Sequence, residues 1–239
     1  MTITDLEAAR IKSLPGDAFY IADFISEDEE SLLLQKITAA PLPRWTHLSH
    51  RRLQTWPSAL TKSNALISSP LPSWLVSPII TPRFDSLGIF ADAPHGVPNH
   101  VLVNEYCSGQ GIMPHEDGAA YYPLVATVSL GAPIVLDLYE KSRNGEANGN
   151  GRPRYRILQE RRSLLVTTKS IYTDLLHGIA DTAKDEELGP ESICNWDLLR
   201  ERDRYECGWL DRGTRISLTY RDVLKVVKMG NTMKFLGDR

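Results

Sequence analysis

The second half of the chain is dominated by short runs in which apolar and polar residues alternate. Six runs follow one another from residue 100 onward: HVLVNEY, PLVATVSL, PIVLDLYE, YRILQE, SLLVTT and TRISLTYRDV. Alternation places successive side chains on opposite faces of a strand, and the spacing between the runs suits hairpins. The pattern predicts a mainly β (α+β) fold with a sandwich or jelly-roll core over residues 100–224.

The first 99 residues carry one helix signal, followed by a long stretch rich in proline and serine. The segment FYIADFIS predicts a strand, and Ser26 with Glu29 forms a capping box that predicts a helix through LLLQKITAA toward Pro41. Residues 41–100 contain PLPRW, SSPLPSW and DAPHGVP, so we expect extended loops there with one short helix near residues 79–87. The flanking helix and loops would cover the core as a lid region.

Two insertions interrupt the predicted core. We expect KSRNGEANGNGRPR, at 141–154, to be a disordered hairpin loop. We expect the charged stretch 181–212 to hang over the mouth of the barrel, where it could repel polyanions or select a protein partner. The lysine-dotted tail, 225–239, fits either a C-terminal strand with a frayed end or a second nucleic-acid contact. The prediction is one domain over residues 1–239, with 1–99 as the N-terminal helix and lid region.

Composition narrows the functional classes. A chain of 239 residues with 42% hydrophobic content can bury one core, and its net charge of −3 excludes a strongly basic nucleic-acid binder, so a local patch would have to meet any polyanion. Cys107, Cys194 and Cys207 are widely spaced without a CxxC pair, which disfavours disulfides and structural zinc and favours a reducing compartment. The first residues carry acidic groups where a secretory signal would be basic and contain no apolar region, so we expect no secretory signal there. No apolar run reaches the ~18 to 20 residues that span a bilayer. We expect a soluble protein of the cytoplasm and also of the nucleus, with no membrane partner.

The segment MPHEDG contains a candidate metal site. On an extended segment His115 and Asp117 project to the same side, where both could bind one ion. His177 follows SLLVTT, and the next strand of a jelly roll could bring it alongside. Two histidines and one carboxylate leave open positions for cosubstrate and oxygen on non-haem iron(II). The same ligands could hold a zinc ion with a hydrolytic water, and an isolated H-x-D pair is often an ordinary surface feature. A cosubstrate site in the same chain would distinguish an oxygenase from both alternatives.

The segment RISLTYR supplies that candidate cosubstrate site. Arg215, Ser217, Thr219 and Arg221 share one face of the predicted strand, and at ~3.3 Å per residue the two guanidinium groups can converge to within roughly 7 Å. Arginine binds carboxylates through a planar two-donor fork, so this face suits a short dicarboxylate such as 2-oxoglutarate. The competing interpretation is an exposed edge strand whose charges resist aggregation. Two further hydrogen-bonding groups, Asn104 and Tyr106, alternate on one side of HVLVNEY.

Taken in order, N-x-Y, H-x-D, a distal histidine and R-x-S-x-x-x-R resemble the AlkB family of iron(II)- and 2-oxoglutarate-dependent dioxygenases. The surrounding segments are similar to the subfamily of the sixth AlkB homologue, notably PRWTHLSHRRLQTW, NHVLVNEYCSGQGIMPHEDGAAYYPLVATVSLG, VLDLYE, LLHGI and RGTRISLT. The resemblance covers the chain from about residue 18 to residue 224 and is weakest in the two insertions. It implies a double-stranded β-helix (jelly roll) core.

The resemblance also implies roles for the candidate residues. The catalytic iron ligands would be His115, Asp117 and His177. Arg215, Ser217 and Tyr106 would hold the far carboxylate of 2-oxoglutarate, and Asn104 and Arg221 would lie near the end that chelates iron. Ser217 departs from the asparagine of the founding bacterial member.

The cofactors implied by the resemblance are Fe(II), 2-oxoglutarate as cosubstrate and O2, with ascorbate as the reductant in vitro. The reaction implied is oxidative demethylation or dealkylation of RNA or DNA bases, in which the alkyl carbon is hydroxylated and lost as an aldehyde.

A base must leave its stack to be modified, so the nucleic acid would be single-stranded or present a flipped base to a pocket with aromatic walls. Candidate walls are Trp45, Trp56, Tyr121 and Tyr122, for which ordinary packing is the alternative. The densest positive cluster in the lid region could meet phosphates or be a solvated loop, and it comprises Arg44, His47, His50, Arg51 and Arg52. The substrate residues predicted from these sets are Arg51, Arg52, Trp56, Tyr121 and Tyr122.

Two other functions compete with nucleic-acid dealkylation. A protein or small-molecule hydroxylase with the same cofactors would fit the acidic charge balance. A non-catalytic nucleic-acid-binding module is the third hypothesis, although retention of every metal and cosubstrate position argues against lost catalysis.

Overall fold

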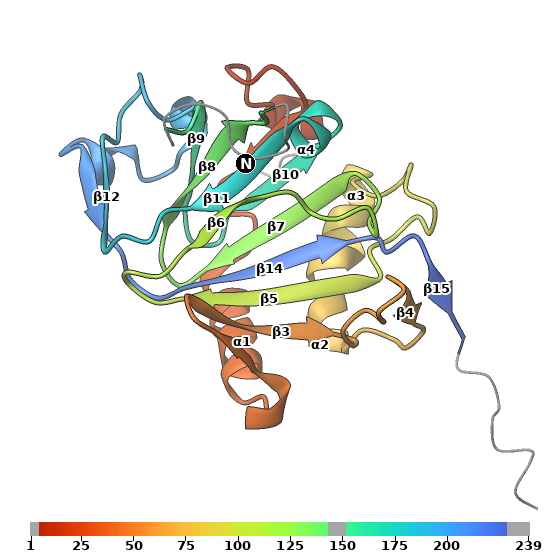
Figure 1. Cartoon of the computed structure of the whole chain (residues 1–239). Helices are drawn as coiled ribbons and strands as arrows, with labels where there is room; N and C mark the ends of the chain where they lie inside the picture. The colour runs from red at the N-terminus through yellow and green to blue at the C-terminus, as the bar shows by residue number, and fades with distance from the viewer. Residues whose placement is uncertain (1–4, 143–151, 229–239) are drawn as a thin grey trace, which may run out of the picture.

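The computed structural model describes residues 5–142 and 152–228, and two antiparallel β-sheets form its centre (Figure 1). The strands of the larger sheet are β1 (Ala18–Ile21), β2 (Thr46–Leu48), β3 (Arg51–Trp56), β5 (His100–Tyr106), β7 (Leu124–Leu130), β10 (Leu164–Thr168) and β14 (Arg215–Arg221). Those of the smaller sheet are β6 (Ile112–His115), β8 (Ile134–Glu140), β9 (Tyr155–Gln159) and β11 (Leu175–Ile179).

The strand order identifies the fold as a jelly roll, as the alternating pattern predicts. The larger sheet has the order β1-β10-β7-β14-β5-β3-β2 and the smaller one β6-β11-β8-β9, and the two line opposite walls of one cavity. All six predicted runs form strands. Strand β14 lies between β7 and β5 and all seven of its residues are buried, so the exposed-edge interpretation of RISLTYR is wrong.

Helices cover the outer face of the larger sheet. They are α1 (Glu27–Thr38), α2 (Ser73–Val76), a helical segment Ile79–Phe84 and α3 (Asp85–Leu87), and a further short helix, α4 (Ser170–Thr173), follows β10. Helix α1 begins at the predicted capping box, in which the Ser26 hydroxyl accepts from the Glu29 amide and the Glu29 carboxylate accepts from the Ser26 amide. Such a cap stabilises a helix by about 1 kcal/mol.

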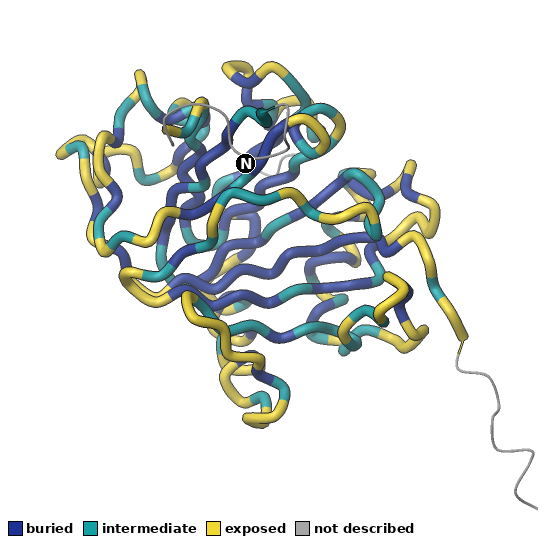
Figure 2. Tube along the Cα trace, in the orientation of Figure 1, coloured by how far each residue is buried: buried dark blue, intermediate teal, exposed yellow. Residues whose placement is uncertain are grey.

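The main core lies between these helices and the outer face of the larger sheet. Ile216, Leu218 and Tyr220 of β14 point into it, and Leu33 and Ile37 of α1 pack from the other side. Figure 2 shows buried residues along the central strands, with exposed residues concentrated in the connecting loops. Since strand side chains alternate, the polar residues of β14 must face the opposite way, into the cavity between the sheets.

The lid region is more ordered than its proline-rich sequence suggests. Part of the stretch 41–100 forms the β2–β3 hairpin, which extends the larger sheet through pairing of β3 with β5, so the prediction of loops with one helix is wrong there. The predicted helix near 79–87 is present. The local sequence of β3 gives only a weak strand signal. The strand is stabilised by hydrogen bonds to β5 and by packing on both faces, and neither can be read from a short stretch of sequence.

The insertion 181–212 packs against the smaller sheet. It contains β12 (Lys184–Glu186), β13 (Trp209–Asp211) and helical turns at Trp196–Leu198 and Arg202–Tyr205. The Asn195 amide bonds both the N–H and the carbonyl of Leu158, at 3.0 and 2.8 Å, and so covers the free edge of β9. None of its residues lines the cavity, and the expectation that it hangs over the mouth of the barrel stays a prediction.

Two remaining segments lie at the margins of the fold. Strands β4 (Leu66–Ile67) and β15 (Val226–Val227) form a short parallel ladder, and further helical turns lie at Leu6–Ala9 and Leu42–Arg44. The predicted hairpin loop of the first insertion falls largely on residues 143–151, and most of the tail falls on residues 229–239, both outside the described residues. None of the described helices is long and apolar enough to cross a membrane.

Candidate metal and cosubstrate site

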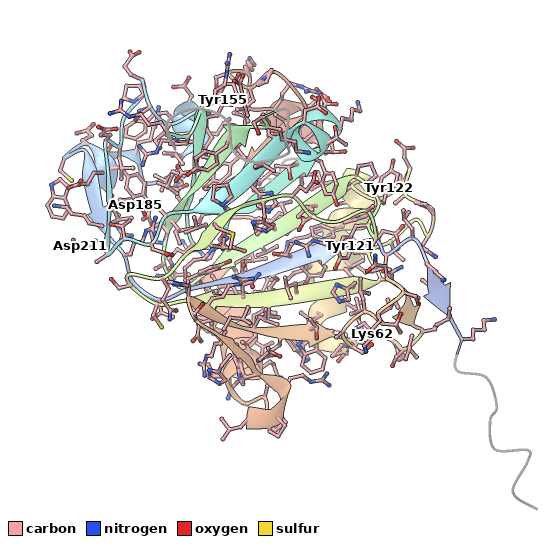
Figure 3. The ribbon with its side chains drawn as sticks, in the orientation of Figure 1. Lys62, Tyr121, Tyr122, Tyr155, Asp185 and Asp211 are labelled. Atoms are coloured by element: carbon pink, nitrogen blue, oxygen red, sulfur yellow. The ribbon has the colours of Figure 1, made fainter. Side chains whose placement is uncertain are left out.

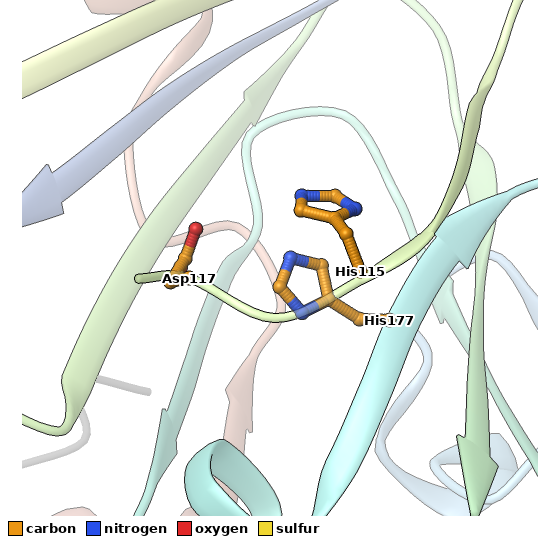
Figure 4. A group of neighbouring side chains, drawn as sticks. All are labelled: His115, Asp117 and His177. Atoms are coloured by element: carbon orange, nitrogen blue, oxygen red, sulfur yellow. The ribbon is translucent and has the colours of Figure 1, made fainter. Parts of the chain in front are cut away.

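The three predicted metal ligands meet between β6 and β11. His115 ends β6 and lies directly opposite His177 of β11, and the centroids of the two rings are 4.3 Å apart. Asp117 follows in the loop after β6, and one ligand atom from each residue lies within 4.8 Å of the others. Figure 4 shows the three side chains turned toward a common point. In the described part of the chain this is the one trio of such groups that could hold a metal ion.

Each imidazole can offer one ring nitrogen to that point. The His115 Nδ1 donates to the Met113 carbonyl at 2.9 Å, which leaves the Nε2 lone pair for a metal. Burial lowers the pKa of His177 to about 4, against the opposing effect of the Asp117 carboxylate, so this ring is neutral at physiological pH. Two imidazoles and one carboxylate are a donor set that suits iron(II) with open coordination positions.

Arg221 positions the carboxylate of this trio. Its Nη2 donates to Asp117 Oδ1 at 2.5 Å, and both side chains are at least nine-tenths buried. A carboxylate held through Oδ1 still has a second oxygen that can bind a metal. The Tyr121 ring lies 4.8 Å from the Arg221 guanidinium, and the Tyr172 hydroxyl donates to the Asp117 carbonyl at 3.4 Å.

Arg215 is a buried cation with no carboxylate beside it among the described residues. Only 3% of the residue is exposed, and its Nη2 donates to the neutral Ser129 hydroxyl at 2.9 Å and to the Gln159 Oε1 at 3.2 Å. Its Nε atom is buried and has no described hydrogen-bond partner. Burial lowers the pKa of Arg215 to about 10, and the group remains charged at neutral pH. Burying a charge without a counterion costs free energy, so this guanidinium is a candidate binding site for an anionic group of a ligand.

A cavity of about 150 Å³ joins the metal trio to Arg215. Arg215 pairs with Tyr106 across the sheet, and Ser217 pairs with Asn104, so the polar faces of β14 and β5 line one wall, as the alternation predicts. Burial raises the pKa of Tyr106, which keeps the phenol protonated and able to donate a hydrogen bond. The cavity is therefore lined by neutral donors and cations at one end and by metal-ligand groups at the other.

The two adjacent arginines of the predicted basic cluster separate onto opposite faces of β3. Arg51 lines the cavity and donates from Nε to Asn104 Oδ1 at 3.3 Å. Arg52 points away, forms bonds of 2.6 and 2.8 Å with the Glu105 carboxylate, and lies over the Trp45 ring at 4.1 Å. Its charge is already neutralised, which makes it a poor phosphate ligand.

The predicted aromatic walls also divide. Trp56 packs on the main core, edge-on to Trp74, with Arg44 over its ring at 3.8 Å, and Trp45 is buried in the same core. These tryptophans therefore do not line the cavity. Tyr122 packs against the core as well, whereas Tyr121 lies over Arg221 at the metal end. His47 and His50 lie at the exposed β2–β3 hairpin, where His50 approaches Asp181.

Sequence reasoning missed Gln159 and Ser129. Both are buried, and both contact Arg215 from strands other than β14. Gln159 ends the apolar run YRILQ and Ser129 lies inside VATVSL, so a polar residue near the end of a buried strand was the one available signal. Nothing local shows that these two strands face Arg215.

Comparisons with known proteins agree on one group. No family model matches the chain. The chain is 39% identical over 230 residues to a zebrafish (Danio rerio) protein named probable RNA/DNA demethylase ALKBH6, covering 95% of this chain and 94% of the relative. It is 28% identical over 231 residues to the macaque (Macaca fascicularis) tRNA (carboxymethyluridine(34)-5-O)-methyltransferase ALKBH8, covering 90% of this chain and 31% of that protein. The solved structure of OsALKBH1 shares the fold at a TM-score of 0.51 and 17% identity, covering 87% of this chain and 99% of that one.

Proposed function

This chain belongs to the AlkB family of iron(II)- and 2-oxoglutarate-dependent dioxygenases, and from that premise we propose that it oxidatively removes methyl or other alkyl groups from nucleic-acid bases. The observation that carries the proposal is one cavity that holds both an open metal trio and a buried, unpaired arginine. A zinc hydrolase would need the metal trio but would have no use for the arginine. The relative with 39% identity is named a probable RNA/DNA demethylase, which supports the substrate class.

In this proposal His115, Asp117 and His177 hold the iron. When bound, iron(II) supplies oxygen activation coupled to decarboxylation of 2-oxoglutarate, which oxidises the alkyl carbon of the substrate. The Met113 carbonyl fixes the tautomer of His115, and Arg221 fixes the orientation of Asp117, so both ligands are preorganised. The C–N bond of the hydroxylated alkyl group then breaks, the hydroxyl proton passes to the base nitrogen, and the alkyl carbon leaves as an aldehyde, which restores the unmodified base.

Arg215 receives the far carboxylate of 2-oxoglutarate, with Ser217 and Tyr106 as further donors. Asn104 and Arg221 lie nearer the metal and orient the chelating end. Gln159 contributes as well, because its Oε1 accepts a hydrogen bond from Arg215 and holds the guanidinium in place. Neutral acceptors around Arg215 leave its positive charge intact for the ligand, whereas an acidic neighbour would cancel it.

For the substrate, we propose that the base enters at the metal end, beside Tyr121, with Arg51 at the cavity. Arg52 and Trp56 are not part of this proposal, because the one is paired with Glu105 and the other faces the core. We further propose one catalytic domain over the whole chain. Its three cysteines are free, which fits a reducing compartment such as the cytoplasm or nucleus.

One observation favours a second substrate class. The insertion 181–212 carries ten acidic and five basic residues, and a protein partner with a basic surface would fit it. A protein hydroxylase is therefore the alternative to be tested beside the nucleic-acid dealkylase.

The test is mass spectrometry of RNA, DNA and peptides incubated with the protein, iron(II), 2-oxoglutarate and ascorbate. Loss of a methyl group from a nucleoside, with one succinate formed per methyl lost, is the expected result. A gain of one oxygen on a peptide, with nucleosides unchanged, would replace the proposal by the alternative. The His115→Ala variant serves as the control for metal-dependent turnover.

A further inference from the structure

We propose that the surface around the β4–β15 ladder binds the backbone of a single-stranded nucleic acid beside the cavity. This surface, the β4–β15 face, is made of Lys62, Ile67, Leu224, Lys225, Val227 and Lys228. The inference rests on the proposed function, because it says where the strand lies when one of its bases enters the cavity.

The face adjoins the loop that carries a metal ligand. The amide of Leu224 donates to the Ala120 carbonyl at 2.9 Å, and Tyr121 forms an isolated bridge with Val223. The amide of Leu66, which begins β4, donates in turn to the Lys225 carbonyl at 2.9 Å. Backbone contacts therefore link the loop that follows Asp117 to strands β15 and β4, beside which the lysines lie. In Figure 3 Lys62 and Tyr121 lie toward the same end of the larger sheet.

The lysines of this face carry uncompensated charge. Within the described ranges, lysine ion pairs are limited to Lys141 with Glu116 and Lys169 with Asp17. Lys62, Lys225 and Lys228 are exposed, and the segments 57–84 and 223–228 contain no acidic residue at all. The segments that form the face therefore supply no carboxylate that could neutralise these lysines. Their ammonium groups remain available to phosphates.

The charge distribution of the molecule orients a polyanion toward this face. The insertion 181–212 has a net charge of −5, from ten acidic and five basic residues, so the remainder carries +2 of the total of −3. Figure 3 places Asp185 and Asp211 of the insertion at the opposite end from Lys62. Repulsion by the acidic insertion and attraction by the lysines would direct a nucleic-acid strand to the β4–β15 face.

Exposed apolar side chains favour an unpaired strand over a duplex. Ile67, Leu224 and Val227 are 36%, 45% and 37% exposed between the lysines. A single strand offers both phosphates and apolar base faces, whereas a duplex hides the bases in its stack. The mixture of charge and apolar surface therefore matches a single strand, and it sits within reach of a cavity that needs an unstacked base.

The experiment compares two matched double variants of the full chain, Lys62→Ala with Lys225→Ala, and Lys12→Ala with Lys36→Ala. Lys12 and Lys36 are exposed as well but lie outside the face. Binding of a fluorescent single-stranded oligonucleotide is titrated over a range of salt concentrations. Loss of two phosphate contacts should reduce the slope of log K against log salt by about 1.4, at about 0.7 per contact on a single strand. The control pair should keep the wild-type slope.

Equal slopes for the two variants would overturn the proposal. Displacement of the oligonucleotide by polyglutamate at equal charge concentration would also overturn it, because the face would then be a docking site for acidic protein segments. A second readout is kcat/KM on a methylated 20-mer relative to a methylated trinucleotide, a ratio that should fall for the face variant alone. If no methylated nucleic acid is turned over while the slopes still differ, the proposed function fails and the binding face stands. If turnover occurs while the slopes agree, the binding face fails and the function stands.

Discussion

Replacing Gln159 by glutamate should weaken 2-oxoglutarate binding, because Arg215 would then have a carboxylate of its own. The substituted carboxylate would stand where Gln159 Oε1 now lies, 3.2 Å from Arg215 Nη2. A hydrogen bond between charged groups stabilises by about 1.5–3 kcal/mol, and an incoming ligand carboxylate would have to compete with it. At 1.4 kcal/mol per factor of ten, the dissociation constant of 2-oxoglutarate should rise roughly 10- to 100-fold.

The same change should leave the fold at least as stable, which separates it from general damage. Burial without a carboxylate lowers the pKa of Arg215 to about 10, so the wild-type guanidinium is held at a cost that an internal partner would relieve. We expect the melting temperature of Gln159→Glu to equal or exceed that of the wild type. Gln159→Met keeps the volume but adds no charge. It removes one acceptor that orients Arg215 and introduces no competing carboxylate, so its affinity for 2-oxoglutarate should fall by about tenfold at most.

Calorimetric titration of 2-oxoglutarate with manganese(II) in place of iron(II) measures binding without turnover. The expected order of affinity is wild type, then Gln159→Met, then Gln159→Glu. Wild-type affinity in a folded Gln159→Glu protein would show that Arg215 is not the carboxylate receptor, and the assignment of this end of the cavity would have to be abandoned.

Three shorter predictions concern other parts of the site. His115→Ala should abolish decarboxylation of 2-oxoglutarate while circular dichroism shows an unchanged fold, since ligands of an open site contribute little to folding, and retained turnover would remove His115 from the ligand set. Arg221→Lys should lower the maximal rate as well as the affinity for 2-oxoglutarate, by tenfold or more in rate, because it loosens a metal ligand, and a change in affinity alone would contradict that role. Arg51→Ala should weaken oligonucleotide binding with little change in melting temperature. Arg52→Ala should leave oligonucleotide binding nearly unchanged but lower the free energy of unfolding by about 1–2 kcal/mol, because the Glu105 carboxylate loses its partner.

The local patterns of the sequence determined much of the architecture. The period of two fixed the six main strands, and it fixed which residues of β14 share a face, since a strand cannot turn one side chain without turning its neighbours. The capping box fixed the start of α1, because its two hydrogen bonds involve residues three apart. The spacing of His115 and Asp117 likewise predicted that both could reach one point.

Tertiary structure decided everything that depends on which segments become neighbours. The pairing of β6 with β11 brings His177 to His115, and the pairing of β3 with β5 sends Arg51 to the cavity and Arg52 to Glu105, although the two arginines are adjacent in sequence. A period of two says that they must part, but the sheet they join decides which one faces the cavity. Gln159 meets Arg215 across the gap between two sheets, a contact set by how the sheets pack, and no pattern within either strand encodes it.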